Sequence, residues 1–224
     1  MDRDSILNRL DALDVCALSD ALDKLGLPPS ESGLLPRSVV GRISGRVKTV
    51  KLAAAVPGVV ARRHLCTAAI VSASPGDVIV VEQRTGLNAA GWGGVLSNAA
   101  QIAGIRGAIV EGPARDIDEA RDIGFPVYSR EMTARTARGR VAEVETGGVI
   151  EVGGVKVSEG DYVAIDASGA AFIASAHIVG VLEVAEQIAH REGRMTQDVR
   201  AGKSVESVMS TDYETMLSGD SIAF

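Results

Sequence analysis

The hydrophobic positions at the start of the chain repeat at helical spacing. Over residues 5–25, apolar side chains recur every three or four positions, and Gly26 followed by Pro28 and Pro29 ends the pattern. A repeat of this kind predicts one helix with an apolar face. The same spacing predicts further helices over residues 62–72, 95–103, 117–123 and 177–191.

Short aliphatic runs bounded by turn residues alternate with these helices, and such runs predict β-strands. The pair Gly153-Gly154 predicts a hairpin turn between two of them. Alternating elements followed by a β-rich region predict a single α/β (α+β) domain over residues 1–224 with a mixed sheet. Residues 195–224 are more polar and are expected to form a polar or interface tail. Strands are expected at residues 45–51, 78–81, 107–110, 125–128, 141–145, 149–152, 155–157 and 162–165.

Composition and charge narrow the classes of function. Aromatic residues make up only 3% of the chain, so the core must be aliphatic. The formal net charge of -6 disfavours nucleic-acid binding, which needs a dense basic surface. The sequence has no apolar run of about 20 residues, so no membrane span is predicted. Without a hydrophobic signal core at the N-terminus, a soluble cytoplasmic protein is expected.

The cysteines and histidines give no sign of a reactive cluster. Cys16 and Cys66 lie among aliphatic neighbours and are expected to be small buried residues in a reducing cell. His64, His177 and His190 are scattered, and none lies in a zinc-binding pattern. We therefore do not expect any of the three to be catalytic.

The strongest candidate chemistry lies in the segment Gly112-Pro113-Ala114-Arg115-Asp116-Ile117-Asp118-Glu119, between an apolar strand and a short helix. Ligands favour the carboxyl ends of strands in such sheets. Arg115 could bind a carboxylate with two parallel hydrogen bonds, and Asp116 is a hard oxygen donor suited to Mg²⁺. Two interpretations stay open: Asp116 and Glu119 form a capping box on the helix, or both carboxylates face a cleft and bind a metal.

A glycine-rich segment, Gly91-Trp92-Gly93-Gly94-Val95-Leu96, precedes another predicted helix. Glycines there let backbone N–H groups approach an anion, helped by the positive end of the helix dipole. An ordinary tight turn explains the same residues. The segment matches neither a Walker motif nor a dinucleotide fingerprint.

Taken together, the two segments are similar to a known signature. Gly94, twenty intervening residues, Arg115-Asp116, two residues and Glu119 resemble the G-x20-R-D-x2-E/D pattern. That pattern marks proteins similar to regulator of ribonuclease activity A (RraA-like), which are relatives of the class II 4-hydroxy-4-methyl-2-oxoglutarate aldolases. The resemblance covers roughly residues 14–192 and includes Leu18-Ser19-Asp20-Ala21-Leu22, Pro75-Gly76-Asp77-Val78, Gly124-Phe125-Pro126-Val127 and Glu159-Gly160-Asp161.

The resemblance implies a fold, an assembly and an activity. The fold would be an αββα-sandwich similar to the swivelling phosphohistidine domain, in a homotrimer or hexamer with sites at subunit interfaces. The activity would be that of a divalent-metal-dependent lyase on a small 2-oxo acid. It would act by retro-aldol cleavage or oxaloacetate decarboxylation, through a pyruvate enolate. The implied site consists of Gly93, Gly94, Val95 and Leu96 for substrate binding, Arg115 for substrate binding and catalysis, and Asp116 and Glu119 for Mg²⁺, Mn²⁺ or another divalent cation.

One departure from the aldolases bears on the reaction. Those enzymes resemble this chain but carry an Asp where it has Gly94, and family members with Gly there usually place an acid where this chain has Glu119. Decarboxylation needs no base, so it is the easier reaction for such a site. The sequence identifies neither a general base, nor the metal, nor the residues that bind the distal end of the substrate. The alternative function is that of a non-catalytic, protein-binding regulator of a ribonuclease.

Overall fold

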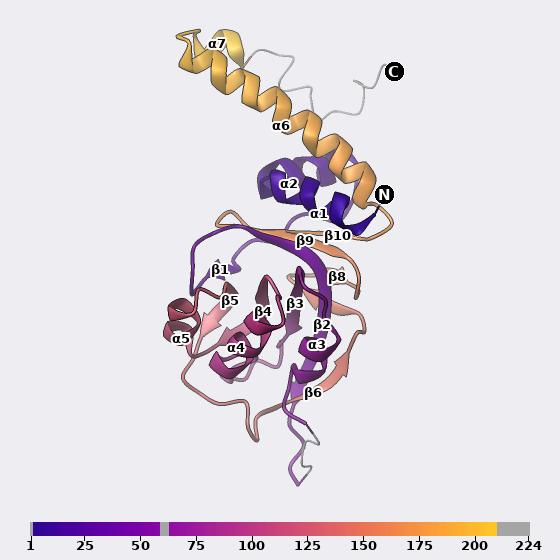
Figure 1. The fold of residues 1–224 in the computed structure, drawn as a ribbon, viewed down its shortest axis with the longest axis vertical. Helices are drawn as coiled ribbons and strands as arrows, with labels where there is room; N and C mark the ends of the chain where they lie inside the picture. Colours follow the sequence, from indigo (N-terminus) through magenta and orange to yellow (C-terminus); the bar gives the residue numbers. More distant parts are fainter. Residues whose placement is uncertain (1, 59–62, 210–224) are drawn as a thin grey trace.

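The computed structural model describes residues 2–58 and 63–209, and within them an eight-stranded mixed sheet is flanked by helices (Figure 1). The strand order is β1-β5-β4-β3-β2-β9-β10, with β6 also paired to β2. The helices are α1 (Arg3–Ala12), α2 (Val15–Lys24), α3 (Thr67–Ser72), α4 (Gly94–Ile102), α5 (Ile117–Asp122), α6 (Ile178–Arg200) and α7 (Val205–Val208). The strands are β1 (Leu35–Pro36), β2 (Ile43–Ala54), β3 (Asp77–Glu82), β4 (Gly107–Ala114), β5 (Val127–Met132), β6 (Val141–Thr146), β7 (Ile150–Val152), β8 (Val155–Val157), β9 (Tyr162–Ile165) and β10 (Ala170–Ile173).

The middle of the sheet is parallel and buried on both faces. Strands β2, β3, β4 and β5 pair in parallel, and α3, α4 and α5 lie in the connections between them. Every residue of β3 is buried, as expected for a central strand covered on both sides. Its Ile79 and Val81 face one core, while Val78 and Val80 face another. The aliphatic run that predicted this strand therefore reflects burial on two faces.

Strand β2 is long enough to pair with different strands at its two ends. Its first residues pair with β9, its last residues pair with β6, and the register shifts between Lys51 and Leu52. A shift of this kind is a β-bulge, which bends a strand and increases its twist. The sheet therefore curls instead of remaining flat.

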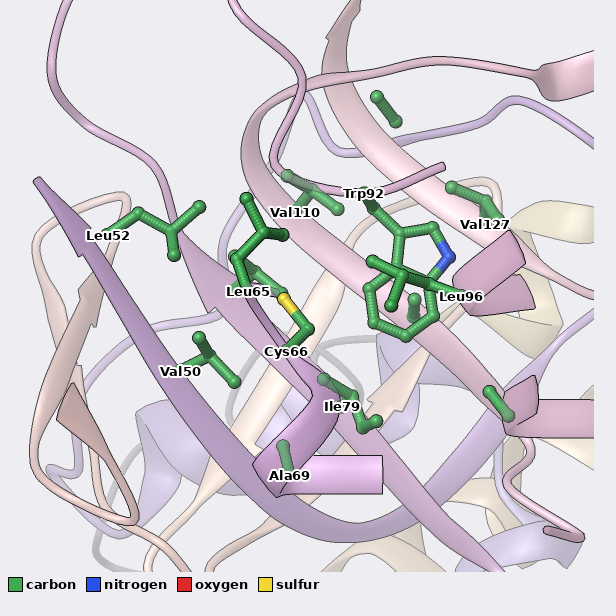
Figure 2. Packing of buried hydrophobic residues seen from close by; sticks show 14 of the residues in the cluster. Val50, Leu52, Leu65, Cys66, Ala69, Ile79, Trp92, Leu96, Val110 and Val127 are labelled. Atoms are coloured by element: carbon green, nitrogen blue, oxygen red, sulfur yellow. The ribbon is translucent and has the colours of Figure 1, made fainter. Parts of the chain in front are cut away.

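The helices cover the curled sheet from two sides. Helices α3, α4 and α5 pack on the face that carries Val50, Ile79 and Val110, and Figure 2 shows this core around Trp92 and Leu96. Helices α1, α2 and α6 pack on β9 and β10, and α6 then continues away from the body towards α7 (Figure 1). A third aliphatic core lies on the opposite face of the central strands and includes the β7–β8 hairpin. That hairpin turns at Gly153 and Gly154, as predicted.

The helix predicted over residues 5–25 is two helices. Leu13 has an extended backbone, and Asp14 begins α2 by accepting a 2.8 Å hydrogen bond from the amide of Ala17. The prediction of one helix was wrong because the apolar spacing continues across this break. Leu10, Leu13 and Ala17 all contribute to the same core, although they lie on two helices or between them.

Other boundaries also differ from the predictions. Helix α3 begins at Thr67, while Arg62 of the predicted helix lies outside the described residues. Helix α6 extends to Arg200, beyond the predicted end and into the range expected to be a tail, and residues 210–224 of that tail are outside the described residues. Cys66 is fully buried, as predicted, but Cys16 is exposed, so the expectation for Cys16 was wrong.

Among the described residues, none of the helices combines the length and apolar character needed to cross a bilayer.

Candidate active site

The two sequence segments singled out above lie side by side at the carboxyl end of β4. The amide of Gly91 donates to the carbonyl of Pro113 (2.8 Å), and the amide of Arg115 donates to the carbonyl of Trp92 (3.0 Å). Trp92 and Ala114 form an isolated parallel bridge between these two bonds. The glycine-rich segment therefore runs parallel to the last residues of β4. This pairing places the start of α4 beside the start of α5.

Trp92 lies buried beneath the place where the two segments meet. Its ring is buried and stacks on Phe125, with ring centroids 6.2 Å apart. Its indole Nε1 donates to the hydroxyl of Ser97 (2.9 Å), and that hydroxyl also lies 3.2 Å from the carbonyl of Gly93. Figure 2 shows the ring packed beside Leu96 of α4. The first turn of α4 is therefore held against a rigid aromatic side chain.

Asp116 caps the neighbouring helix and not its own. Its Oδ2 accepts a 3.0 Å hydrogen bond from the amide of Gly94, the first residue of α4, and it makes no side-chain cap on α5. The backbone of Asp116 is left-handed (φ 55°, ψ 40°), a conformation that costs a non-glycine residue about 1 kcal/mol. This conformation turns the carboxylate away from the amides of α5. The capping-box interpretation was therefore wrong.

Glu119 approaches the same glycine from the first turn of α5. Its Oε1 accepts a 2.8 Å hydrogen bond from the side chain of Asn98, and its Oε2 occupies the space that a Cβ atom on Gly94 would need. Both predicted metal-binding carboxylates therefore lie against Gly94. The carboxylate of Asp116 accepts a hydrogen bond from its amide, and the carboxylate of Glu119 lies beside its Cα. An acidic side chain at position 94 would take the place that Glu119 now fills.

Arg115 supplies the positive charge of the site. Its Nε lies 3.3 Å from Oδ2 of Asp116, and the side chain is 36% exposed. Within the described residues, Asp116 is its single carboxylate partner. The outer face of the guanidinium is thus available for an anionic ligand.

A cavity of about 80 Å³ lies over the place where the two segments meet. Every site residue predicted from the sequence lines the cavity except Glu119, which lies behind Gly94 on the side of Asn98. A second part of the lining was not predicted. It is formed by His64, Leu65, Thr136 and Ala137.

A buried carboxylate on β6 positions part of that lining. The side chain of Glu143 is only 6% exposed, and it accepts hydrogen bonds from the amide of Cys66 (2.6 Å), from Arg63 (2.9 Å) and from Thr146 (2.7 Å). Cys66 has a left-handed backbone (φ 66°), which the bond to its amide helps to hold. Glu143 therefore anchors the turn that presents His64 to the cavity.

The acidic groups have the chemistry to hold a hydrated divalent cation. No cluster of three or more His, Cys, Asp or Glu side chains suited to a metal occurs in residues 2–58 and 63–209. Oδ1 of Asp116 has no hydrogen-bond partner among those residues, and Asp116 is one of the residues that line the cavity. Mg²⁺ commonly binds one or two carboxylates and keeps several waters, so these donors fit it.

Comparison with known proteins shows that the chain matches a protein family. The family model described as Aldolase/RraA (RraA-like) matches residues 15–171. The chain is 30% identical over 171 residues to the protein of Halalkalibacterium halodurans named "Putative 4-hydroxy-4-methyl-2-oxoglutarate aldolase". That alignment covers 76% of this chain and 77% of the relative.

Solved structures share the fold. An uncharacterized protein from Pseudomonas syringae pv. tomato superposes with a TM-score of 0.83 at 25% identity, over 92% of this chain and 98% of that one. Streptomyces coelicolor RraAS2, described as an unusual member of the RNase ES inhibitor RraA protein family, superposes with a TM-score of 0.77 at 20% identity. That comparison covers 88% of this chain and 98% of RraAS2. The chain has the curled mixed α/β fold of these proteins and belongs to the RraA-like (Aldolase/RraA) family.

Proposed function

We propose that the protein is a divalent-metal-dependent lyase that cleaves a carbon–carbon bond of a small 2-oxo acid through a pyruvate enolate. One observation carries the proposal. The amino end of α4, the guanidinium of Arg115 and the carboxylate of Asp116 converge on one small cavity. The named activity of the relative from Halalkalibacterium halodurans supports the same reaction class.

The backbone of α4 would bind the carboxylate of the substrate. Among the described residues, the amides of Val95 and Leu96 have no hydrogen-bond acceptor, because they belong to the first turn of the helix. They point to the end where the helix dipole is positive, which favours an anion. Gly93 and Gly94 add no side chain of their own at this end of the helix.

Asp116 and Glu119 would hold a divalent cation such as Mg²⁺ or Mn²⁺, which would supply Lewis-acid activation of the 2-oxo group. Arg115 would bind the 2-oxo acid and neutralise the negative charge that develops as the carbon–carbon bond breaks. In the decarboxylation, the bonding electrons stay with pyruvate as its enolate, carbon dioxide leaves, and a proton from solvent completes the product. In the retro-aldol reaction, a base must also remove the hydroxyl proton.

The experiment is a coupled pyruvate assay with oxaloacetate and with 4-hydroxy-4-methyl-2-oxoglutarate, in the presence of Mg²⁺ or Mn²⁺. We expect Asp116→Asn and Arg115→Ala each to lower turnover by about 100-fold or more. The matched control is Asp118→Asn, because Asp118 lies two residues further on, in the first turn of α5, but its side chain is 93% exposed and pairs with Arg121. Unchanged turnover in the Asp116 and Arg115 variants would show that the site is assigned wrongly.

We further propose that the protein assembles as a homotrimer or hexamer in which another subunit covers the cavity. Val95, Ala99 and Ile102 form a stripe at helical spacing on α4, and Val95 and Ile102 are 82% and 88% exposed. Val71 of the adjacent α3 is 86% exposed. Apolar side chains grouped in this way are typical of an interface. Ile102→Glu should shift the mass measured by light scattering to that of a monomer, whereas an unchanged mass would place the interface elsewhere.

We also infer that the layers correspond to the αββα-sandwich of the swivelling phosphohistidine domain. Helices α1, α2 and α6 cover one side, α3, α4 and α5 cover another, and the curled strands enclose a third aliphatic core. This order of layers supports the inference.

A second candidate function is the binding and regulation of a ribonuclease. The likeness in fold to Streptomyces coelicolor RraAS2 supports it. The test is a ribonuclease E-type cleavage assay with and without the protein, using Asp116→Asn in parallel. Inhibition that persists in the variant, with no pyruvate released by the wild type, would favour this candidate over the lyase.

A further inference from the structure

The lining of the cavity includes one titratable side chain, His64, that is neither a proposed ligand of the cation nor a fixed positive charge. Three of the described residues in the lining carry an ionisable side chain: His64, Arg115 and Asp116. The carboxylate of Asp116 accepts a hydrogen bond from the amide of Gly94 and pairs with Arg115. The guanidinium of an arginine stays protonated in proteins. Among these three, His64 is therefore the group that is left to accept a proton from a substrate.

The hydrogen bond of the His64 ring determines which of its nitrogens is free. Nδ1 lies 3.0 Å from the carbonyl oxygen of Leu65. Because a carbonyl oxygen only accepts hydrogen bonds, Nδ1 of the neutral ring carries the hydrogen. Nε2 then has a lone pair and no hydrogen, so it accepts a proton and cannot donate one. The neutral ring is thus in the form that a general base requires.

The turn that carries His64 is held by contacts on its far side. The hydroxyl of Thr67 donates to the carbonyl oxygen of His64 (2.7 Å), and the amide of Cys66 donates to the buried carboxylate of Glu143 (2.6 Å). Leu65 and Cys66 are buried, while the His64 ring is exposed. The backbone is therefore fixed, and the ring stays accessible to a ligand.

His64 lies where the reacting hydroxyl of an aldol substrate would be. It lines the cavity of about 80 Å³ and also an adjoining space of about 670 Å³, as Arg115 does. The smaller space has room for the carboxylate and keto group of a 2-oxo acid and little else. The hydroxyl of an aldol substrate is attached to the second carbon beyond the keto carbon. With the keto group at Arg115, this hydroxyl would lie at the border of the two spaces, which His64 lines.

We infer that His64 is the general base of the retro-aldol reaction. The inference rests on the proposed function, because it assumes that a 2-oxo acid is bound at Arg115. Nε2 takes the proton of the substrate hydroxyl, and the electrons of that O–H bond form the carbonyl group of one product. The carbon–carbon bond breaks, and its electrons stay with the other fragment as the pyruvate enolate. The imidazolium then returns the proton to the methylene carbon of the enolate, which gives pyruvate and restores the neutral ring.

This role concerns one of the two proposed reactions. Decarboxylation of oxaloacetate removes no hydroxyl proton, so it does not use the base. Both reactions need Arg115 and the cation, so a comparison of the two substrates separates the loss of a base from general damage to the site. The isolated position of His64 in the sequence gave no reason to expect such a role, which follows from the contact of Nδ1 and from the cavity.

The test measures pyruvate release from 4-hydroxy-4-methyl-2-oxoglutarate and from oxaloacetate in parallel, with Mg²⁺ present. His64→Gln keeps a polar side chain but removes the group that takes up a proton. The ratio of retro-aldol to decarboxylation turnover should fall about 100-fold or more, the usual loss when a general base is removed. Imidazole added to His64→Ala should restore part of the retro-aldol turnover. The matched control is His177→Gln, an exposed histidine that lines neither space, and its ratio should stay at the wild-type value.

A chemical label provides a measurement that does not depend on turnover. Diethyl pyrocarbonate acylates an unprotonated nitrogen of histidine, and mass spectrometry of peptides separates His64 from His177 and His190. 2-Oxoglutarate has the chain length of the aldol substrate but no hydroxyl, so the retro-aldol reaction cannot cleave it. Together with Mg²⁺ it should slow the labelling of His64 and leave the labelling of the other two unchanged.

The outcomes distinguish this inference from the proposed function. An unchanged ratio in His64→Gln, an equal loss of both reactions, or labelling of His64 that 2-oxoglutarate does not slow would overturn the inference and leave the lyase assignment intact. A wild-type protein that decarboxylates oxaloacetate but does not cleave the aldol substrate would do the same. If the wild type acts on neither substrate, the proposed function itself fails, and the role of His64 fails with it.

Discussion

Oε2 of Glu119 fills the space in which a Cβ atom on Gly94 would lie. The two positions therefore cannot both carry an extended side chain without movement of one of them. The atom in the way is the end of a flexible side chain, so Glu119 can swing aside at little cost. What would be lost is its place beside Asn98 and above the start of α4.

Replacement of Gly94 by Ala should separate stability from activity. Ala in a helix is favoured over Gly by up to about 1 kcal/mol, which offsets the displacement of Glu119, so the free energy of unfolding should change by less than about 1 kcal/mol. The displaced carboxylate should raise the Mg²⁺ concentration needed for half-maximal pyruvate release. Urea unfolding and a metal titration of turnover measure the two effects.

The matched control for this substitution is Gly180→Ala in α6. A Cβ atom on Gly180 meets nothing within 4 Å, so this variant should gain about 0.5–1 kcal/mol of stability and keep its metal dependence. If Gly94→Ala left the metal dependence equally unchanged, Glu119 would have no part in holding the cation.

Glu143→Gln should weaken the fold and loosen the wall of the cavity. A glutamine cannot satisfy the Cys66 amide, Arg63 and Thr146 together, and a buried donor left unpaired costs about 1–3 kcal/mol. Because the turn that carries His64 would lose its anchor, KM should rise more than kcat falls. Glu145→Gln on the same strand is exposed and should alter neither quantity. A KM that stays constant would show that Glu143 does not position this wall.

The two thiols should differ sharply in reactivity. Burial, together with the nearby charge of Glu143, raises the pKa of the Cys66 thiol, while Cys16 is exposed. Because the thiolate is the reactive form, an aromatic disulfide reagent should titrate one thiol in the native protein and two in denaturant. Cys16→Ser should remove the fast reaction, and a fast reaction that survives this change would contradict the burial of Cys66.

The ion pair between Arg9 of α1 and Glu186 of α6 should make stability depend on pH. The hydrogen bond from Arg9 (2.6 Å) lowers the pKa of Glu186 below its ordinary value of 4.5. A lowered pKa contributes stability above the unfolded-state value, and this contribution is lost as the pH falls through the folded-state value. Glu186→Gln should therefore lower stability by up to about 1 kcal/mol at neutral pH. In urea titrations the two proteins should converge in acid, and a constant difference would rule out this ion pair as the cause.

The parts of the fold that could be predicted are those in which local pattern and burial agree. Strand β3 follows a Pro-Gly-Asp turn as a continuous aliphatic run, and both of its faces are buried. The break between α1 and α2 was missed because hydrophobic spacing records which side chains face the core, and this face is continuous across Leu13 and Asp14. The end of α6 was missed because residues 192–200 are largely exposed, so no apolar periodicity marks them.

The site was predictable only where it is local in sequence. Arg115 and Asp116 were identified by their spacing from Gly94, and the structure brings all three together. The direction of the Asp116 carboxylate could not be predicted, because it depends on one left-handed residue. The His64 wall and its anchor Glu143 lie on other elements, which only the pairing of β6 with β2 brings near the cavity.

The buried ring beneath the site also has a practical use. Trp92 is the only tryptophan in the chain, and it is bonded to Ser97 in the first turn of α4. Its fluorescence therefore comes from a single place, under the amides that would receive a ligand. Any event that shifts the start of α4 would change the emission of this one fluorophore, so the protein carries an optical reporter of its own site without chemical labelling.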